Sequence, residues 1–282
     1  MAFQLTGFSQ RLIMAYKQRV ALLPNTVTTD GVAEGLTYKF LVGDDGTDEA
    51  TTRGANGRIQ YTSLSRTQYS VTMAEYIAAF RETGFNIFTS QGNVEQMMHD
   101  AVIGKIMRKK DQVIITALTA ATVTTASYTI ANYLQFQQAI ATLQNAGVPL
   151  DSSITFTVTP AFRAYMGQWT EFSNAQLVGP TMLPMQNGGP AYTDQIQMWR
   201  WNGVNVLVHP KLPGNGTAAE TCFLYHSKSI GLGFATSEEK VEAGWDPIER
   251  ASYCNMETYV GATVLQNGGI VKIKHDGSAL QL

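Results

Sequence analysis

The sequence predicts an α+β protein, and three observations carry this prediction. Two segments within 35–75 alternate polar and apolar residues, as strands do. The longest helical pattern runs over about 93–118, and mixed helical and strand patterns follow it. From Thr221 to Leu282 only strand and turn patterns occur. A chain of 282 residues can hold one large domain or two modest ones.

The composition narrows the classes of function. Charged residues make up 15% of the chain, against about 25% in typical globular proteins, so part of the surface is either uncharged or covered by neighbours. The net charge is -2 and no long block of like charges occurs, which argues against tight autonomous binding of nucleic acid. Neither a membrane-spanning run nor a signal peptide is present, so we expect a soluble protein made in the cytoplasm.

The first predicted element is a short amphipathic arm. Apolar residues recur at helical spacing over 9–23, and Pro24 is expected to end the helix. Its polar side carries Arg11, Lys17 and Arg19. These cations are either a solvated face or a weak contact with nucleic acid or a scaffold.

A long hairpin is predicted over 35–75. Its strands are LTYKFLVG and TQYSVTM, and the connection between them is rich in Gly, Asp and Thr. A connection of this length is uncommon in a compact domain and is usually functional or disordered. The edges of such a hairpin would expose unpaired backbone groups, which docking onto a neighbouring subunit would cover.

The long helix follows an extended stretch at Ala79–Phe88. Asn93 is a suitable N-cap, with Gln96 at capping-box spacing. About 25 residues at 1.5 Å each give a helix of ~38 Å. A run of three cations, Arg108 to Lys110, is either a nucleic-acid patch or a solvated turn. Its expected apolar face contains Val94, Met97, Met98, Ala101, Val102 and Ile106.

The region after this helix predicts a compact unit. A helix from about Tyr133 ends near Gly147, a strand covers Ile154–Val158, and a helix follows at Phe162–Trp169. Asn202-Gly203 joins QIQMWRW to VNVLVHP, a strong hairpin signal. The strands beyond Thr221 are expected to complete a sheet with the long hairpin and the extended stretch before the long helix.

No catalytic, cofactor or metal site is predicted. His99, His209, His226 and His275 lie in different elements, without the spacing of a metalloprotease motif. Cys222 and His226 can share a strand face, but two ligands do not make a structural zinc site. The two cysteines are expected as buried free thiols, with a single disulfide as the alternative. The acidic residues Asp44, Asp45, Asp48 and Glu49 lack the closing acid of a calcium loop, because Ala55 stands there.

Five passages together resemble the tailed-bacteriophage major capsid proteins of the Hong Kong 97-type fold. They are LTYKFLVG with RGANG, NVEQMMHDAVIGKIM, QAIATLQNAGVPLDSSITFTVTPAF, VNVLVHP and YVGATVLQNGGIVKI. The resemblance implies an N-terminal arm at 1–34, an extended loop hairpin at 35–75 and an axial domain at 127–226. It also implies a peripheral domain, at 76–126 and 227–282, with a spine helix at 93–118.

The resemblance also implies a function. Hexamers and pentamers would close into an icosahedral head around double-stranded DNA, with Arg53, Asn56 and Arg58 of the loop against an adjacent subunit and the arm on the inner face. Expected partners are a separate scaffolding protein, a portal, a decoration protein as a further option, and DNA held by non-specific contact. The protein would be assembled in the host bacterial cytoplasm, without intersubunit cross-links, because Lys39 lies in the hairpin stem and not at its tip. The alternatives are an encapsulin-like compartment shell, a tail component and an unrelated soluble enzyme.

Overall fold

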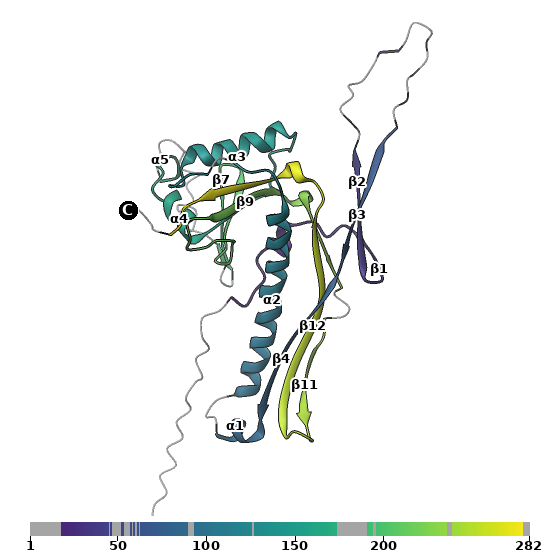
Figure 1. Cartoon of the computed structure of the whole chain (residues 1–282), viewed down its shortest axis with the longest axis vertical. Helices are drawn as coiled ribbons and strands as arrows, with labels where there is room; N and C mark the ends of the chain where they lie inside the picture. Colours follow the sequence, from purple (N-terminus) through teal and green to yellow (C-terminus); the bar gives the residue numbers. More distant parts are fainter. Residues whose placement is uncertain are drawn as a thin grey trace, which may run out of the picture.

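The computed structural model has three parts: a round part with mixed helices and strands, a long helix lying along a sheet, and a projecting hairpin (Figure 1). It describes residues 18–44, 46, 52–53, 57, 59, 61, 63–89, 93–125, 127–173, 191–193, 196–235 and 239–278. The α+β class predicted from the sequence is confirmed.

The hairpin part is a three-stranded antiparallel sheet of order β1–β2–β3. Its strands are β1 (Val32–Glu34), β2 (Thr37–Asp44) and β3 (Ser65–Thr72). β2 and β3 pair from Thr37↔Thr72 to Asp44↔Ser65, so the predicted hairpin stem is confirmed. Phe40 is the one residue of these three strands that is buried.

The second part is a four-stranded sheet built around one long strand, β12 (Ala251–Val264). One edge of β12 pairs with β4 (Ala74–Thr83) over ten residues. The other edge pairs in tandem with β11 (Val241–Asp246) and β10 (Ile230–Phe234). β11 was missed by the sequence analysis. Val241, Ala243 and Trp245 alternate with polar residues or glycine there, but the alternation is short and most of its residues are exposed.

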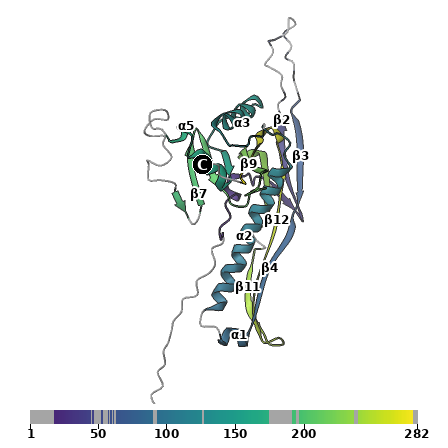
Figure 2. The same cartoon turned by 60° about the vertical axis from the view of Figure 1, so that its left-hand side comes forward.

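Helix α2 (Val94–Ala120) lies along this sheet, as both views show (Figures 1 and 2). Its 27 residues correspond to about 40 Å. The Asn93 side chain accepts a hydrogen bond from the Gln96 N–H, as the predicted cap requires. The amide of Gln96 donates to Asp100 instead of completing the capping box. The helix buries an apolar stripe against the sheet, formed by Val94, Met98, Val102 and Ile106 with Ala78, Cys254 and Met256.

The round part contains a six-stranded sheet of order β13–β9–β5–β8–β7–β6. Its strands are β5 (Ile154–Val158), β6 (Ala191–Thr193), β7 (Ile196–Trp201), β8 (Val204–Val208), β9 (Glu220–His226) and β13 (Ile270–His275). β5 and β8 are parallel, and the other pairs are antiparallel. Asn202 and Gly203 have φ of 49° and 79°, so the predicted tight turn between β7 and β8 is confirmed.

Three helices accompany this sheet: α3 (Tyr133–Asn145), α4 (Pro160–Met166) and α5 (Thr170–Ser173). Their aromatic side chains form a dense core in which Phe136 stacks on Phe156 and Trp201 at ring distances of 5.2 and 4.8 Å. The C-terminal strand β13 belongs to this sheet, so the strands after Thr221 are divided between two sheets. The domain boundaries stay a prediction.

Two local predictions are wrong. The expected extended stretch Ala79–Phe88 is a strand only to Thr83, and Gly84–Thr89 forms the short helix α1. The N–H of Gly84 donates to the carbonyl of Arg250 directly after the last pair of β4 and β12, Thr83↔Ala251, and the chain turns into the helix from there. The arm helix predicted over 9–23 is absent from its described part, 18–23, and Pro24 begins a 3₁₀ turn, Pro24–Thr26.

Candidate functional site

The described part of the hairpin exposes an unusual amount of apolar surface. Six of its large apolar side chains are more than half exposed. Single exposed apolar residues are normal, but a group of them on one projection marks an interaction surface. The exposed residues are Val32, Leu36, Leu41, Ile59, Tyr61 and Leu64.

The base of the hairpin is held by close packing on β10. Phe40 is 2% exposed and its ring lies directly against Gly231. Tyr38 lies against Gly233 in the same way, with its Cβ 2.6 Å from where a side chain at Gly233 would begin. The sequence Gly231-Leu232-Gly233 therefore has a packing role: it leaves room for two aromatic rings of the hairpin.

The predicted contact residues at the hairpin tip are only partly described. Arg53 is exposed, and Asn56 and Arg58 lie outside the described residues. Arg11 and Lys17 of the arm also lie outside them. Arg19 is described, and its guanidinium lies 3.6 Å from the carboxylate of Asp100 on α2. The structure therefore brings Arg19 to the long helix.

The start of the described arm is fixed by a buried carboxylate on α2. Asp111 is 1% exposed, and it accepts hydrogen bonds from the backbone N–H groups of Leu22 and Leu23 at 2.9 and 3.0 Å. The amide of Gln18 also donates to it, and Nε2 of His209 lies 3.2 Å away. Asp111 thus joins three segments that are distant in sequence. These bonds replace the helical bonds that the sequence analysis expected for the arm.

Sequence reasoning missed Asp111, although a signal was present. Ile114, Ile115 and Leu118 follow it at spacings of three, four and seven, and all three are buried. A charged residue on the apolar stripe of a helix must be paired to be buried, so its position pointed to a partner from another segment.

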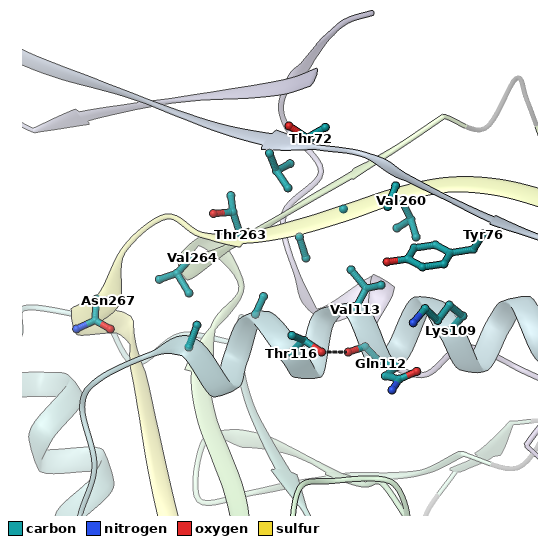
Figure 3. A pocket seen from close by; sticks show the side chains of 16 residues that line it. Thr72, Tyr76, Lys109, Gln112, Val113, Thr116, Val260, Thr263, Val264 and Asn267 are labelled. Carbon is teal, nitrogen blue, oxygen red and sulfur yellow. Dashed lines mark hydrogen bonds between the residues drawn. The ribbon is translucent and has the colours of Figure 1, made fainter. Parts of the chain in front are cut away.

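A groove of about 680 Å³ lies between α2, β12 and the base of the hairpin (Figure 3). Small residues keep it open, among them Ala74 and Ala117. Lys109 is the single charged side chain among its lining residues. Thr116 turns its hydroxyl back to the carbonyl of Gln112 within the helix, at 2.8 Å. A groove of this kind offers a contact surface and holds no acid–base pair.

Two ionisable groups of the round part are buried side by side. His275 and Glu220 are each fully buried, with Nε2 and Oε2 2.9 Å apart. Thr159 donates its hydroxyl to the same carboxylate at 2.5 Å, and the N–H of Gly216 donates to its other oxygen at 2.6 Å. Burial lowers the pKa of His275 below its usual 6.5, against the opposing effect of Glu220.

The two cysteines are buried free thiols, as predicted. Burial raises the pKa of Cys222 to about 12, so this thiol stays protonated and is a poor nucleophile. Cys222 and His226 lie on the same strand, but Nε2 of His226 lies 3.4 Å from Asp151 and not at the sulfur. Over the described ranges, no three His, Cys, Asp or Glu side chains form a possible metal site.

No α-helix in the described part of the chain combines the length and the apolar character needed to cross a membrane.

Solved structures of phage capsids share this fold. A chain of Mycobacterium phage Che8 superimposes with a TM-score of 0.72 at 14% identity, covering 93% of each chain. The capsid of cyanophage P-SCSP1u gives a TM-score of 0.66 at 12% identity, covering 98% of this chain and 94% of the other. The capsid of Ralstonia phage GP4 gives 0.68 at 8% identity, covering 95% and 94%. No curated protein matches the sequence.

The sequence itself matches the phage capsid protein family over residues 2–159 and 193–277, which is most of the chain. This match and the shared fold confirm the predicted Hong Kong 97-type fold and the predicted role of a major capsid protein that forms the shell of a phage head. The chain belongs to the phage capsid protein family.

Proposed function

We propose that copies of this chain form hexamers and pentamers that close into an icosahedral head around a double-stranded DNA genome. The observation that supports this best is the hairpin, whose exposed apolar residues are left uncovered by the rest of the described chain. Burying a side chain such as Leu41 or Ile59 against another subunit would contribute about 1.5–3 kcal/mol each. A contact of this head-to-tail kind, repeated around an axis, closes a ring.

In this proposal the hairpin of one subunit covers the adjacent subunit. Arg53, Asn56 and Arg58 near its tip contact that neighbour. The arm, with Arg11, Lys17 and Arg19, lies toward the enclosed DNA. Arg19 contributes less to this charge than the other two, because it already pairs with Asp100. The contact with DNA is non-specific and weakens with salt, since few phosphates are neutralised by each chain.

We infer that the activity is assembly and not catalysis. Two His–carboxylate pairs, His209–Asp111 and His275–Glu220, are buried, and the Cys222 thiol is protonated, which favours this role. Assembly in the host bacterial cytoplasm would involve a separate scaffolding protein and a portal, with a decoration protein as an additional partner. We expect no cross-links between subunits, because Lys39 lies in the hairpin stem within hydrogen-bond distance of Glu34.

The test is assembly of hairpin variants, followed by size-exclusion chromatography and negative-stain electron microscopy at several salt concentrations, with and without a candidate scaffold. The triple variant Leu41→Thr, Ile59→Thr, Tyr61→Thr keeps strand-forming residues but removes apolar surface. We expect the wild type to give closed particles or rings, and the variant to remain monomeric with its thermal midpoint nearly unchanged.

The comparison variant is Leu134→Gln, Leu150→Gln, which removes exposed apolar side chains outside the hairpin. It should assemble as the wild type does. A wild-type chain that stays monomeric under every condition would refute the proposed assembly. A hairpin variant that assembles normally would refute the role of the hairpin.

A further inference from the structure

The three consecutive cations Arg108, Lys109 and Lys110 are separated by the fold. Lys110 points to Glu239, with Nζ and Oε1 2.6 Å apart, and its side chain is 13% exposed. Arg108 and Lys109 instead line a pocket of about 320 Å³, which they share with Lys105, Gln112, His209 and Lys211. The three cations therefore do not form one solvated turn. Arg108 and Lys109 line a pocket together with Lys105 and Lys211, whereas Lys110 pairs with Glu239.

The pocket has a strong excess of positive charge. Four permanent cations line it, and no carboxylate does. None of these four cations forms an ion pair with a carboxylate in the described part of the chain. The nearby carboxylate of Asp111 is occupied by the arm and by His209. Like charges gathered in one cavity repel each other, and an anion bound there would relieve this repulsion.

The cations are held in place without neutralisation. Nζ of Lys105 lies 3.7 Å from the centre of the Phe80 ring, and Nζ of Lys109 lies 4.5 Å from that of Tyr76. Arg108 donates a hydrogen bond to the carbonyl oxygen of Gln18 at 2.6 Å. Aromatic faces and a carbonyl orient a cation but carry no net negative charge, so the net positive charge of the pocket is not cancelled. The site is thus ordered before any ligand binds.

The arrangement fits a repeating anion better than a single small one. Lys105, Arg108, Lys109 and Gln112 follow one another along one side of α2 at helical spacing. Lys105 and Lys109 are about 6 Å apart along the helix axis, close to the axial distance of about 6.8 Å between alternate phosphates of one DNA strand, which follow one another every ~3.4 Å. Gln18 also lines the pocket, and the chain that precedes it carries Lys17 and Arg11.

The pocket lies where the arm meets the long helix. In both views the chain after Gln18 runs along α2 on the side away from β12 (Figures 1 and 2). We propose that this pocket, formed by Lys105, Arg108, Lys109 and Lys211, binds backbone phosphates of the double-stranded DNA enclosed by the shell. The identity of the ligand rests on the proposed function, whereas the preference for a polyphosphate follows from the pocket itself.

The test compares two charge-matched variants of the full chain. The pocket variant carries Lys105→Gln, Lys109→Gln and Lys211→Gln. It removes three pocket charges and keeps Arg108, which holds the arm. The control variant carries Lys228→Gln, Lys240→Gln and Lys274→Gln, and it removes three exposed charges outside the pocket. Binding of a short fluorescent DNA duplex is measured by anisotropy from low to physiological salt. Each phosphate contact contributes about 0.9 to the slope of log K against log salt.

We expect the pocket variant to lose about two to three units of this slope and about tenfold or more in affinity at low salt, whereas the control variant stays close to the wild type. Lys211→Gln alone lies outside the aromatic contacts and should lose about one unit. Equal slopes for the pocket and control variants would overturn the proposal. So would an effect of the pocket variant on binding of polyglutamate but not of DNA, because the ligand would then be an acidic protein.

Electron microscopy of the same variants separates this proposal from the proposed function. If the wild type fails to assemble but the pocket variant loses DNA binding, the result supports the phosphate-binding pocket and refutes the proposed assembly. If all variants assemble and bind DNA equally, the result supports the proposed assembly and refutes the phosphate-binding pocket.

Discussion

The ring of Phe40 occupies the space in which a side chain at Gly231 would lie: three of its carbons are 2.6–2.9 Å from the position of a Cβ there. We predict that Gly231→Ala forces this ring away and weakens the attachment of the hairpin to β10. The expected loss is about 1–3 kcal/mol, as for other overpacked sites. Chemical denaturation measures the loss, and limited proteolysis of the hairpin shows whether its base has loosened.

Gly43→Ala is the matched control. Gly43 lies on β2, and a Cβ there would meet only the Leu64 side chain, at 4.0 Å. This substitution should leave the free energy of unfolding nearly unchanged. If the two variants were equally stable and equally resistant to protease, the close contact with Phe40 would not hold the hairpin.

Asp111→Asn should release the arm from α2. The N–H groups of Leu22 and Leu23 donate to Oδ1 of this carboxylate, and the Gln18 amide donates to Oδ2. An Asn at this position has one uncharged oxygen and turns an NH2 group toward one of these two sets of donors. A hydrogen bond to a buried charged group contributes about 1.5–3 kcal/mol, so we expect a loss of about 3 kcal/mol. Hydrogen exchange should show faster exchange of the Leu22 and Leu23 amides.

Asp100→Asn serves as its control, because the Arg19–Asp100 pair is partly exposed and 3.6 Å apart. Such a pair contributes about 0–1 kcal/mol. Unchanged amide exchange in Asp111→Asn would show that the arm is held without the charge of this carboxylate.

The elements that the sequence predicted well are those set by local signals. Asn93 and Gly147 marked the cap of α2 and the end of α3, and Asn202-Gly203 marked a hairpin turn. Strand β5 was predicted at Ile154–Val158, where the structure has it. In each case the signal and the structure lie within a few residues of each other.

The elements that the sequence could not predict depend on distant contacts. The apolar spacing of 9–23 is compatible with a helix, but a carboxylate 88 positions beyond Leu23 takes the N–H groups in its described part. The cluster Arg108 to Lys110 was ambiguous because its meaning depends on Lys211 and Glu239, which only the fold brings near. Strand β11 has only a short alternation, at Val241, Ala243 and Trp245, in mostly exposed residues, and its pairing with β12 defines it.

We predict that both thiols are unreactive in the native protein. Cys222 and Cys254 are buried, and burial raises the pKa of each. At pH 8 a thiol reagent should modify neither residue over minutes, and both should react once denaturant unfolds the chain. Cys222→Ala assigns any residual reactivity to Cys254. Rapid modification of a native thiol would contradict the burial of these strands.

The buried His275 should make stability depend on pH below about 6.5. Burial lowers its pKa in the folded protein, so the unfolded chain takes up a proton at a pH where the folded chain does not. The contribution of His275 to the free energy of unfolding is therefore complete above pH 6.5. It is lost as the pH falls, by up to about 1.4 kcal/mol per pH unit. The charged groups that influence the ring are Glu220 and Asp276, and both favour its protonated form.

Two measurements test the pH dependence of stability. The first follows the ring signals of His275 by NMR, assigned with His275→Gln, and should give a midpoint below 6.5. The second compares urea unfolding at pH 7.5 and 5.5, where the wild type should lose more stability than His275→Gln. A ring that titrates at or above 6.5 would mean that the attraction of Glu220, 2.9 Å away, exceeds the effect of burial, and stability would then rise on acidification through this group.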